Sequence, residues 1–196
     1  MSKRLFDVFF STLGILILSP VLLIISFLIK LDSKGNILYL QNRVGKSGKI
    51  FRILKFRTMV TNADKLGLLT LGDGDNRITK VGRILRKTKL DELPQLFNVF
   101  LGEMSFVGPR PEVKKYVNLY TNAQKEILKL KPGITDYASI KYIDESVILG
   151  NSEDPEKTYI NTIMPHKIKL NKKYLHKQSL VYDIKIIFLT LFKIFR

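Results

Sequence analysis

The sequence predicts an α+β protein in which a small, mostly helical domain with a short β-hairpin follows an N-terminal membrane helix. Three observations lead to this prediction. Residues 8–29 carry no charged side chain, two short apolar segments flank a turn at 45–48, and later segments have apolar residues at helical spacing. With 196 residues the chain is long enough for one compact domain with its own core. We therefore expect a membrane anchor over 1–34 and a single domain over 35–196.

The uncharged run from Val8 to Ile29 is long enough to enter a membrane. As a helix its 22 residues would extend roughly 33 Å, and the hydrocarbon core of a bilayer is about 30 Å thick. A cleaved signal peptide is a poor alternative, because the run is too long and no small-residue cleavage site follows it. A buried helix of a soluble domain is a further alternative, but such domains rarely surround so long a segment with apolar groups.

Ser19-Pro20 lies near the middle of this run and disturbs regular helix geometry. Pro20 has no N–H group, and its ring clashes with the carbonyl group of Leu16. One interpretation is a spanning helix with a proline kink, which a bilayer tolerates when side chains satisfy the freed groups. The other is a re-entrant helix that breaks at Ser19-Pro20 and leaves the membrane on the side it entered. Basic residues on both flanks slightly favour the re-entrant form: Lys3, Arg4, Lys30 and Lys34.

The elements of the domain follow from local composition. Residues 37–40 and 50–54 have the pattern of short strands and predict the hairpin. Residues 62–76 are expected to form a loop. Helical turns are expected over 83–89 and 94–101, and a longer helix over 116–130, which ends at the breaker Lys131-Pro132-Gly133.

The C-terminal segment 180–195 is dense in Leu, Ile and Phe, with Asp183, Lys185 and Lys193 as its only charges. It is too short and too charged to span a bilayer comfortably. Two interpretations remain open. The segment is either an amphipathic helix in the membrane interface, with its lysines reaching outward, or a helix packed against the domain core.

The chain has a formal net charge of +16, and this charge is clustered. Residues 43–89 contain 13 Lys and Arg against three Asp, and residues 165–196 contain eight against one. Such a balance indicates a polyanionic partner: nucleic acid, an anionic membrane surface or a phosphorylated substrate. The apolar run at the N-terminus favours the membrane. The chain has no Cys, which excludes disulfides, thiolate metal sites and a thiol nucleophile.

Two adjacent carboxylates, Asp91 and Glu92, precede the predicted helix that begins at Pro94. One interpretation is structural, because Asp is a favoured N-cap and acidic residues complement the helix dipole. The other is chemical. Arg83, Arg86 and Lys89 lie close in sequence, and carboxylates among cations stay ionised, as a nucleophile or a Mg²⁺ ligand must. Such a carboxylate can attack phosphorus when metal and guanidinium charge neutralise the phosphate oxygens.

Arg110 lies between two prolines, Pro109 and Pro111. The prolines restrict the backbone around it, so the guanidinium group is presented from a stiff loop. Because Arg binds phosphate with two parallel hydrogen bonds, we consider Arg110 a candidate phosphate ligand. A structural turn with a solvated Arg side chain is the alternative.

At these motifs the chain resembles the bacterial sugar transferase family of small monotopic phosphoglycosyl transferases. The matching segments follow one another along most of the sequence: Lys3-Arg4-Leu5-Phe6-Asp7, Ser19-Pro20, Gln41-Asn42-Arg43-Val44-Gly45, Lys55-Phe56-Arg57-Thr58-Met59, Leu90-Asp91-Glu92-Leu93-Pro94-Gln95-Leu96-Phe97-Asn98-Val99, Met104-Ser105-Phe106-Val107-Gly108-Pro109-Arg110-Pro111 and Lys131-Pro132-Gly133-Ile134-Thr135. So many matches in one order make the resemblance highly specific.

The resemblance implies an enzyme that transfers a sugar 1-phosphate from a UDP-sugar to undecaprenyl phosphate and releases UMP. It implies that Asp91 is the nucleophile, forms a phosphosugar intermediate and helps to hold Mg²⁺, and that Glu92 assists as a base. At matching positions it implies four phosphate ligands: Arg86, Arg110, Lys55 and Arg57. It also implies a re-entrant helix, broken at Ser19 and Pro20, that keeps the protein on the cytoplasmic face of the bacterial inner membrane.

The chain departs from the family pattern after Thr135. Many members continue with Gly-Leu-Ala-Gln, whereas this sequence has Asp136-Tyr137-Ala138-Ser139-Ile140. Because this region is a candidate wall of the sugar pocket, the resemblance does not identify the donor sugar. The expected partners are the UDP-sugar, undecaprenyl phosphate and anionic lipids, and nucleic acid is not expected. The competing hypothesis is a basic protein that binds membranes or nucleic acid without catalysis.

Overall fold

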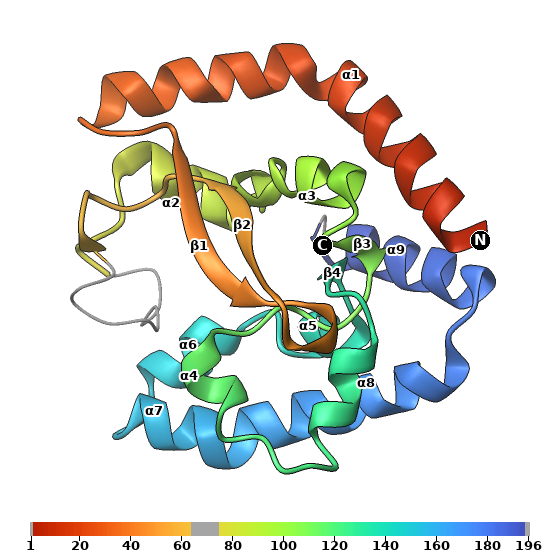
Figure 1. Cartoon of the computed structure of the whole chain (residues 1–196). Coiled ribbons are helices and arrows are strands. Elements are labelled where there is room, and N and C mark those ends of the chain that lie inside the picture. The colour runs from red at the N-terminus through yellow and green to blue at the C-terminus, as the bar shows by residue number, and fades with distance from the viewer. Residues whose placement is uncertain (1, 64–74, 195–196) are drawn as a thin grey trace.

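The structure is a computed structural model that describes residues 2–63 and 75–194. A long helix, α1 (Ser2–Asp32), arches over a domain of short helices and two small sheets (Figure 1). The loop predicted for 62–76 lies mostly outside the described residues. The remaining elements, in chain order, are β1 (Leu38–Val44), η1 (Lys46–Gly48), β2 (Ile50–Phe56), α2 (Lys80–Lys87), η3 (Leu90–Glu92), α3 (Gln95–Leu101), β3 (Ser105–Val107), α4 (Lys114–Val117), η4 (Lys125–Lys129), β4 (Gly133–Thr135), α5 (Tyr137–Lys141), α6 (Glu145–Gly150), α7 (Pro155–Thr158), η5 (Tyr159–Ile163), α8 (Met164–Lys177) and α9 (Leu180–Ile194).

Helix α1 bends along its length but remains one continuous helix (Figure 1). Pro20 lies inside it. The missing N–H of Pro20 would leave the carbonyl group of Leu16 without its helical donor, and the hydroxyl group of Ser19 donates to that carbonyl at 2.8 Å. In this structure Ser19-Pro20 is therefore a site of bending, with no unwound segment. Among the described residues, α1 is the one helix long and apolar enough to cross a membrane.

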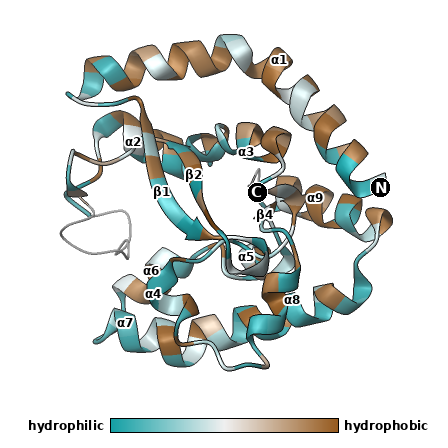
Figure 2. Cartoon of the chain, in the orientation of Figure 1, coloured by the Kyte–Doolittle hydropathy of each residue, from teal (hydrophilic) through white to brown (hydrophobic). Residues whose placement is uncertain are grey.

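The two sides of α1 face different surroundings. Its inner side packs on α2 and α3, where Ile25 and Ile29 join Phe56 and Leu85 in one buried cluster. Its outer side exposes large apolar side chains, which colour the helix mainly as hydrophobic in Figure 2. The exposed large apolar residues of α1 are Leu5, Phe9, Phe10, Leu13, Leu16, Ile17, Val21, Leu23, Ile24, Phe27, Leu28 and Leu31. This side has the composition of a membrane-facing surface.

The N-terminal end of α1 is attached to the domain by polar contacts of Lys3 and Arg4. The ammonium group of Lys3 forms an ion pair with Asp183 of α9 and donates to the carbonyl group of Val107 at 3.0 Å. Arg4 donates to the carbonyl groups of Val99 and Phe100 at 2.6 and 2.7 Å. These carbonyls lie in the last turn of α3, and that of Val99 also accepts the backbone N–H of Gly102 at 3.0 Å.

The C-terminal end of α1 is fastened to the same domain. The carboxylate of Asp32 accepts the backbone N–H of Val81 in the first turn of α2 at 3.0 Å. The guanidinium group of Arg57 donates to the carbonyl groups of Ser33 and Lys34 at 2.7 Å each. Both ends of α1 therefore contact the same domain, over which the helix arches (Figure 1).

The predicted hairpin is confirmed. Strands β1 and β2 pair antiparallel from Leu38–Phe56 to Val44–Ile50, and Ser47 and Gly48 adopt positive φ values in the turn. The second sheet pairs β3 and β4 in parallel. The largest buried cluster lies on the far side of the hairpin from α1 and consists of Val44, Val113, Tyr116, Val117, Tyr120, Ile127, Leu149, Tyr159, Ile163, Met164 and Ile168.

The helix predicted for 116–130 is wrong. The chain instead forms the short helix α4, a turn, and the 3₁₀ segment η4. Thr121 and Gln124 explain the interruption, because each side chain accepts the backbone N–H of the other. This reciprocal pattern starts a new turn and ends the preceding one. The predicted turns over 83–89 and 94–101 correspond to α2 and α3, although α2 begins at Lys80, after the N-cap Thr79.

Helix α9 combines the two interpretations of the C-terminal segment. Asp183 and Ile186 are buried against the domain, whereas Val181, Phe188 and Phe192 are among the most exposed apolar residues of the described chain. One face of α9 therefore packs on the core, as the second interpretation requires. The opposite face is apolar and exposed, so a position in the membrane interface stays a prediction.

Candidate active site

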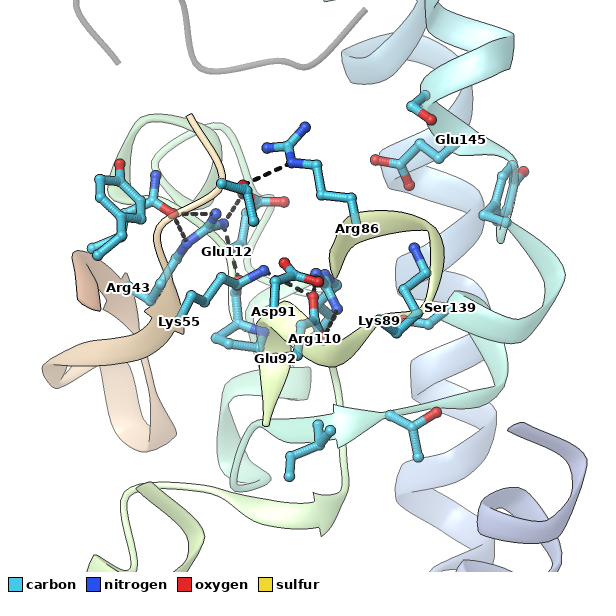
Figure 3. A pocket seen from close by; sticks show the side chains of 18 of the residues that line it. Arg43, Lys55, Arg86, Lys89, Asp91, Glu92, Arg110, Glu112, Ser139 and Glu145 are labelled. Carbon is cyan, nitrogen blue, oxygen red and sulfur yellow. Dashed lines mark hydrogen bonds and ion pairs between the residues drawn. The ribbon is translucent and has the colours of Figure 1, made fainter. Parts of the chain in front are cut away.

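A cavity of about 1180 Å³ lies between the β-hairpin, the connection from α2 to α3, and the wall formed by α5, α6 and α8. Asp91 and Glu92 line it, together with Lys55, Arg86 and Arg110. Figure 3 shows these side chains converging from separate elements on one space. Arg57 lines the same cavity, so all six side chains that the sequence indicated as catalytic or phosphate-binding border one space.

The backbone between α2 and α3 places the two carboxylates in the cavity. Lys89 has a left-handed conformation with φ 58°, which costs a residue with a side chain roughly 1–2 kcal/mol. The chain reverses there and enters the single turn η3, which carries Asp91 and Glu92. Pro94 occupies the N-cap position of α3, and no side chain caps that helix. The capping interpretation of the two carboxylates is therefore wrong.

Glu92 is bound by two cations. Its carboxylate accepts a hydrogen bond from Lys55 of β2 at 2.8 Å and two from the guanidinium group of Arg110, at 3.2 and 2.5 Å. Burial by itself would raise the pKa of Glu92, but the charges of Arg110 and Lys55 hold it well below its usual range. Glu92 is therefore an ionised anchor between the hairpin and the arginine loop.

Asp91 differs from its neighbour. It is 8 % exposed, and within the described part of the chain its carboxylate accepts no hydrogen bond. Burial raises the pKa of Asp91, Lys55 opposes that effect, and the negative charge of Glu92 adds to it. From the sequence, the surrounding cations were expected to keep Asp91 ionised. The structure shows that Glu92 takes their hydrogen bonds and leaves the oxygens of Asp91 available to a ligand.

Arg110 is presented by a loop that crosses the β3–β4 sheet at very close range. A side chain on Gly108 would place its Cβ 2.2 Å from the carbonyl oxygen of Lys131, so only Gly fits. The backbone N–H of Arg110 donates to the buried carboxylate of Asp136 at 3.1 Å. The charge of Glu92 raises the pKa of Arg110, which keeps the guanidinium group fully charged. Arg110 thus belongs to the cavity and is more than a solvated turn residue.

The other two predicted cations have different surroundings. The Nε of Arg86 donates to the hydroxyl group of Thr58 at 2.9 Å, and the rest of its guanidinium group points into the cavity in Figure 3. Arg57, in contrast, is 6 % exposed and holds the carbonyl groups at the end of α1. Arg57 therefore anchors the end of α1, but it also lines the cavity, and its contact with phosphate stays a prediction.

The residues present fit a Mg²⁺ ion held in part by substrate. Among the described residues there is no group of three His, Cys, Asp or Glu side chains that could hold a metal. Mg²⁺, however, is usually held by one or two carboxylates together with substrate phosphates and water. Asp91 offers one such carboxylate, because no side chain of the described residues donates a hydrogen bond to its oxygens.

Of the wall opposite the carboxylates, the sequence indicated the segment 136–140 but not the residues of α6 and α8. Glu145 of α6 and Lys167 of α8 form an ion pair at 2.7 Å, and both line the cavity. Glu145 faces the same space as Arg86 in Figure 3. A polar stripe on α8 was the available signal, because Lys167 and Asn171 are four residues apart on one helical face.

Comparison with known proteins agrees with the motifs. The sequence pattern described as "Bacterial sugar transferase" matches residues 1–196. The chain is 38% identical over 192 residues to a UDP-N-acetylgalactosamine-undecaprenyl-phosphate N-acetylgalactosaminephosphotransferase of Aeromonas hydrophila, covering 96% of this chain and 42% of the relative. It is 39% identical to a UDP-glucose:undecaprenyl-phosphate glucose-1-phosphate transferase of Klebsiella pneumoniae, covering 97% and 39%.

The chain thus spans about two fifths of the length of these two relatives. A relative of similar size is the exopolysaccharide production protein PSS of Rhizobium leguminosarum, which is 38% identical over 95% of this chain and 91% of its own length. The match over the whole chain, together with these relatives, shows that the chain belongs to the bacterial sugar transferase family.

Proposed function

We propose that this chain transfers a sugar 1-phosphate from a UDP-sugar to undecaprenyl phosphate, releases UMP, and passes through a covalent phosphosugar–aspartate intermediate. The observation that carries the proposal is the contrast between the two carboxylates of the site. Glu92 is saturated by Lys55 and Arg110, whereas Asp91 lies beside the same cations with its oxygens free of hydrogen bonds from the described residues. A nucleophile requires that arrangement.

In the first step a carboxylate oxygen of Asp91 attacks the phosphorus atom that bears the sugar. The bond from that phosphorus to the bridging oxygen breaks, and its electron pair leaves with UMP. Lys55, Arg86 and Arg110 neutralise the phosphate oxygens, which otherwise repel the incoming carboxylate. Asp91 and the phosphate groups would hold Mg²⁺, which would supply further positive charge at the diphosphate.

In the second step an oxygen of undecaprenyl phosphate attacks the same phosphorus, and the carboxylate of Asp91 is released. The acceptor needs little help from a base, because a phosphate monoester is largely doubly ionised at pH 7, with a second pKa of about 6. The low pKa of Glu92 argues against proton acceptance by this residue. We assign Glu92 the task of holding Lys55 and Arg110 beside the reacting phosphorus.

The proposal places the enzyme on the cytoplasmic face of the bacterial inner membrane, with α1 as a re-entrant anchor. Both ends of α1 contact one domain, and the apolar surface lies on its outer side. A bent helix with its two ends on one domain is compatible with entry and exit on one face of a bilayer. The net charge of +16 favours contact with anionic lipids.

The decisive experiment is isotope exchange in the absence of acceptor. The full chain in detergent or nanodiscs, with Mg²⁺, is incubated with labelled UMP and either UDP-N-acetylgalactosamine or UDP-glucose. A covalent intermediate predicts that label enters the UDP-sugar and that intact mass shows a phosphosugar adduct. Asp91→Asn should abolish both signals, whereas Asp154→Asn, at the exposed start of α7, should leave them unchanged.

Two outcomes would contradict the proposal. Net transfer to undecaprenyl phosphate without exchange or adduct indicates direct transfer in a ternary complex. No UMP release from any UDP-sugar, combined with tight binding to anionic vesicles or nucleic acid, indicates a basic binding protein without catalysis.

A further inference from the structure

One face of α8 forms a polar wall of the cavity. Met164, Lys167, Ile168 and Asn171 all line the cavity, and their spacing of three, four and seven residues places them on one side of the helix. A helix face that only packed against a core would be apolar at these positions. Two of the four side chains are polar, so this wall is suited to a ligand with polar groups.

Lys167 is held in a defined position on this wall. Its ammonium group pairs with the carboxylate of Glu145 at 2.7 Å and lies 5.9 Å from the ring centroid of Tyr159. An ammonium group has three donors, and a carboxylate has about four acceptor positions. Since the ion pair uses only one of each, both groups retain hydrogen-bonding capacity toward the cavity.

Two further polar atoms near this wall lack partners. The Oδ1 of Asn171 and the Oγ of Ser139 are buried, and neither forms a hydrogen bond within the described part of the chain. Asn171 is 5 % exposed. Because buried polar groups are almost always hydrogen-bonded, such orphan atoms indicate a missing partner.

The polar wall lies next to the phosphate cations. The buried carboxylate of Asp136 accepts the backbone N–H of Arg110 and, at the start of α5, that of Ser139. Helix α5 is thereby fastened to the arginine loop. In a nucleoside diphosphate sugar, the sugar is bonded to the phosphorus that Asp91 attacks, so the sugar ring lies within one ring length of these cations.

We propose that Ser139, Glu145, Lys167 and Asn171 bind the hexose ring of the donor through its hydroxyl groups and thereby select the sugar. This inference rests on the proposed function, since it assigns a part of the same cavity. The carboxylates of Glu145 and the neighbouring Asp144 repel phosphate oxygens, whereas a hexose is neutral. Its hydroxyl groups both donate and accept, which matches an ion pair and an amide.

The test compares kinetics with binding of UMP, which has no sugar. Glu145→Gln, Lys167→Met and Asn171→Leu are prepared in the full chain, and UMP release is measured with UDP-glucose, UDP-galactose, UDP-N-acetylglucosamine and UDP-N-acetylgalactosamine. Losing a hydrogen bond to a charged group should raise the KM of the preferred donor about tenfold or more and change the kcat/KM ratio between epimers. The affinity for UMP should stay within about twofold of wild type, which also shows that the variants fold.

The ion pair between Glu126 and Lys172 provides the matched control. It has nearly the same length, 2.8 Å, and Lys172 lies on another face of α8, away from the cavity. Glu126→Gln and Lys172→Met should leave KM and donor ratios unchanged. The inference is overturned if the wall variants change no donor ratio, or if they weaken UMP as much as the UDP-sugars. A wild-type chain that releases UMP from no UDP-sugar overturns the proposed function itself.

Discussion

At the scale of single residues, Asp91 and Glu92 are neighbours whose surroundings shift their acidity in opposite directions. Burial raises the pKa of Asp91, whereas Arg110 and Lys55 overcome burial and hold the pKa of Glu92 well below its usual range. Carboxylates separated in this way commonly divide two tasks in one site. Here the division is between a reactive oxygen and a fixed anchor.

The raised pKa of Asp91 predicts a conflict between stability and function. A carboxyl group whose pKa is raised by folding destabilises the folded state when ionised, and this cost disappears once the pH falls below the unfolded value of about 3.9. Asp91→Asn should therefore unfold at a higher temperature than wild type at pH 7 in the absence of Mg²⁺ and substrate, and the two should converge near pH 3. Thermal unfolding against pH measures this, and a less stable Asn variant at pH 7 would refute it.

For Glu92 the opposite effect on the stability of the fold is predicted. Its lowered pKa stabilises the fold above the unfolded value of about 4.3, and this contribution is lost as the pH falls through the folded value. Glu92→Gln leaves Lys55 and Arg110 without their carboxylate. We expect a loss of about 2 kcal/mol at pH 7, below the 3–5 kcal/mol of a fully buried pair because Arg110 is 37% exposed.

The measurement is chemical denaturation at pH 7 and again well below the unfolded pKa of about 4.3, near pH 3 or lower, where the difference should shrink. Glu126→Gln, which breaks the exposed pair with Lys172, should change little at either pH. A difference between Glu92→Gln and wild type that does not depend on pH would show that charge is not its cause.

The sequence predicted the reactive part of the site better than its walls. Asp91, Glu92 and Arg110 lie in motifs whose residue types indicate their chemistry, although Glu92 meets Lys55 and Arg110 only through the fold. Arg57 is basic like Lys55 and has a similar sequence context, yet it turns to the end of α1. That choice depends on where a segment more than twenty residues away ends, which no local pattern contains.

At the scale of elements, α1 depends on a competition between its bend and its end contacts. A proline inside a helix costs roughly 3 kcal/mol relative to alanine, so Pro20→Ala removes that penalty and favours a straight helix. A straight helix of 31 residues extends about 46 Å, more than the hydrocarbon core of about 30 Å. The ion pair of Lys3 with Asp183 resists this change, because straightening moves the two ends apart.

We therefore predict that the native chain exposes both ends of α1 on the cytoplasmic side, and that Pro20→Ala combined with Lys3→Met allows a spanning form. The chain has no Cys, so single cysteines at positions 2 and 34 can be labelled selectively in sealed vesicles. Both should react from the cytoplasmic side in the native background. In the double variant, position 2 should react partly from the opposite side.

Ser26→Ala serves as the matched substitution. The hydroxyl group of Ser26 bonds to the carbonyl of Leu22, within a regular stretch of α1. It should leave the labelling pattern unchanged. Labelling of positions 2 and 34 from opposite sides in the native chain would establish a spanning helix and remove the re-entrant proposal.

Element predictions succeeded where one local rule dominated. The hairpin and α3 follow from strand composition around a glycine turn and from a proline before an apolar segment. The prediction of a helix over 116–130 was wrong, although the apolar spacing behind it is real and Tyr116, Tyr120 and Ile127 are all buried. The side chains of Thr121 and Gln124 nevertheless start a separate turn, so two short elements supply what one helix was expected to supply.

At the scale of the whole molecule, apolar and basic surfaces together determine how the domain meets the membrane. The outer side of α1 and one face of α9 expose large apolar side chains. Lys3 of α1 pairs with Asp183 of α9, so the two helices are held to each other as well as to the core. If α1 lies in the bilayer, α9 is carried to the interface with it.

We therefore predict that Phe188 of α9 is in contact with lipid. A single environment-sensitive label at Phe188→Cys, in nanodiscs that contain anionic lipid, should be quenched by quenchers attached to acyl chains. A label at Leu119→Cys is the control, because Leu119 is also exposed but follows α4, on the side of the domain away from α1.

Raising the salt to about 1 M shortens the Debye length to about 3 Å and weakens contacts of the lysines with lipid headgroups. Quenching at position 188 should persist, because burial of apolar area does not depend on charge. Equal quenching at the two positions, or loss of the signal in salt, would place α9 outside the bilayer and leave α1 as the single apolar contact.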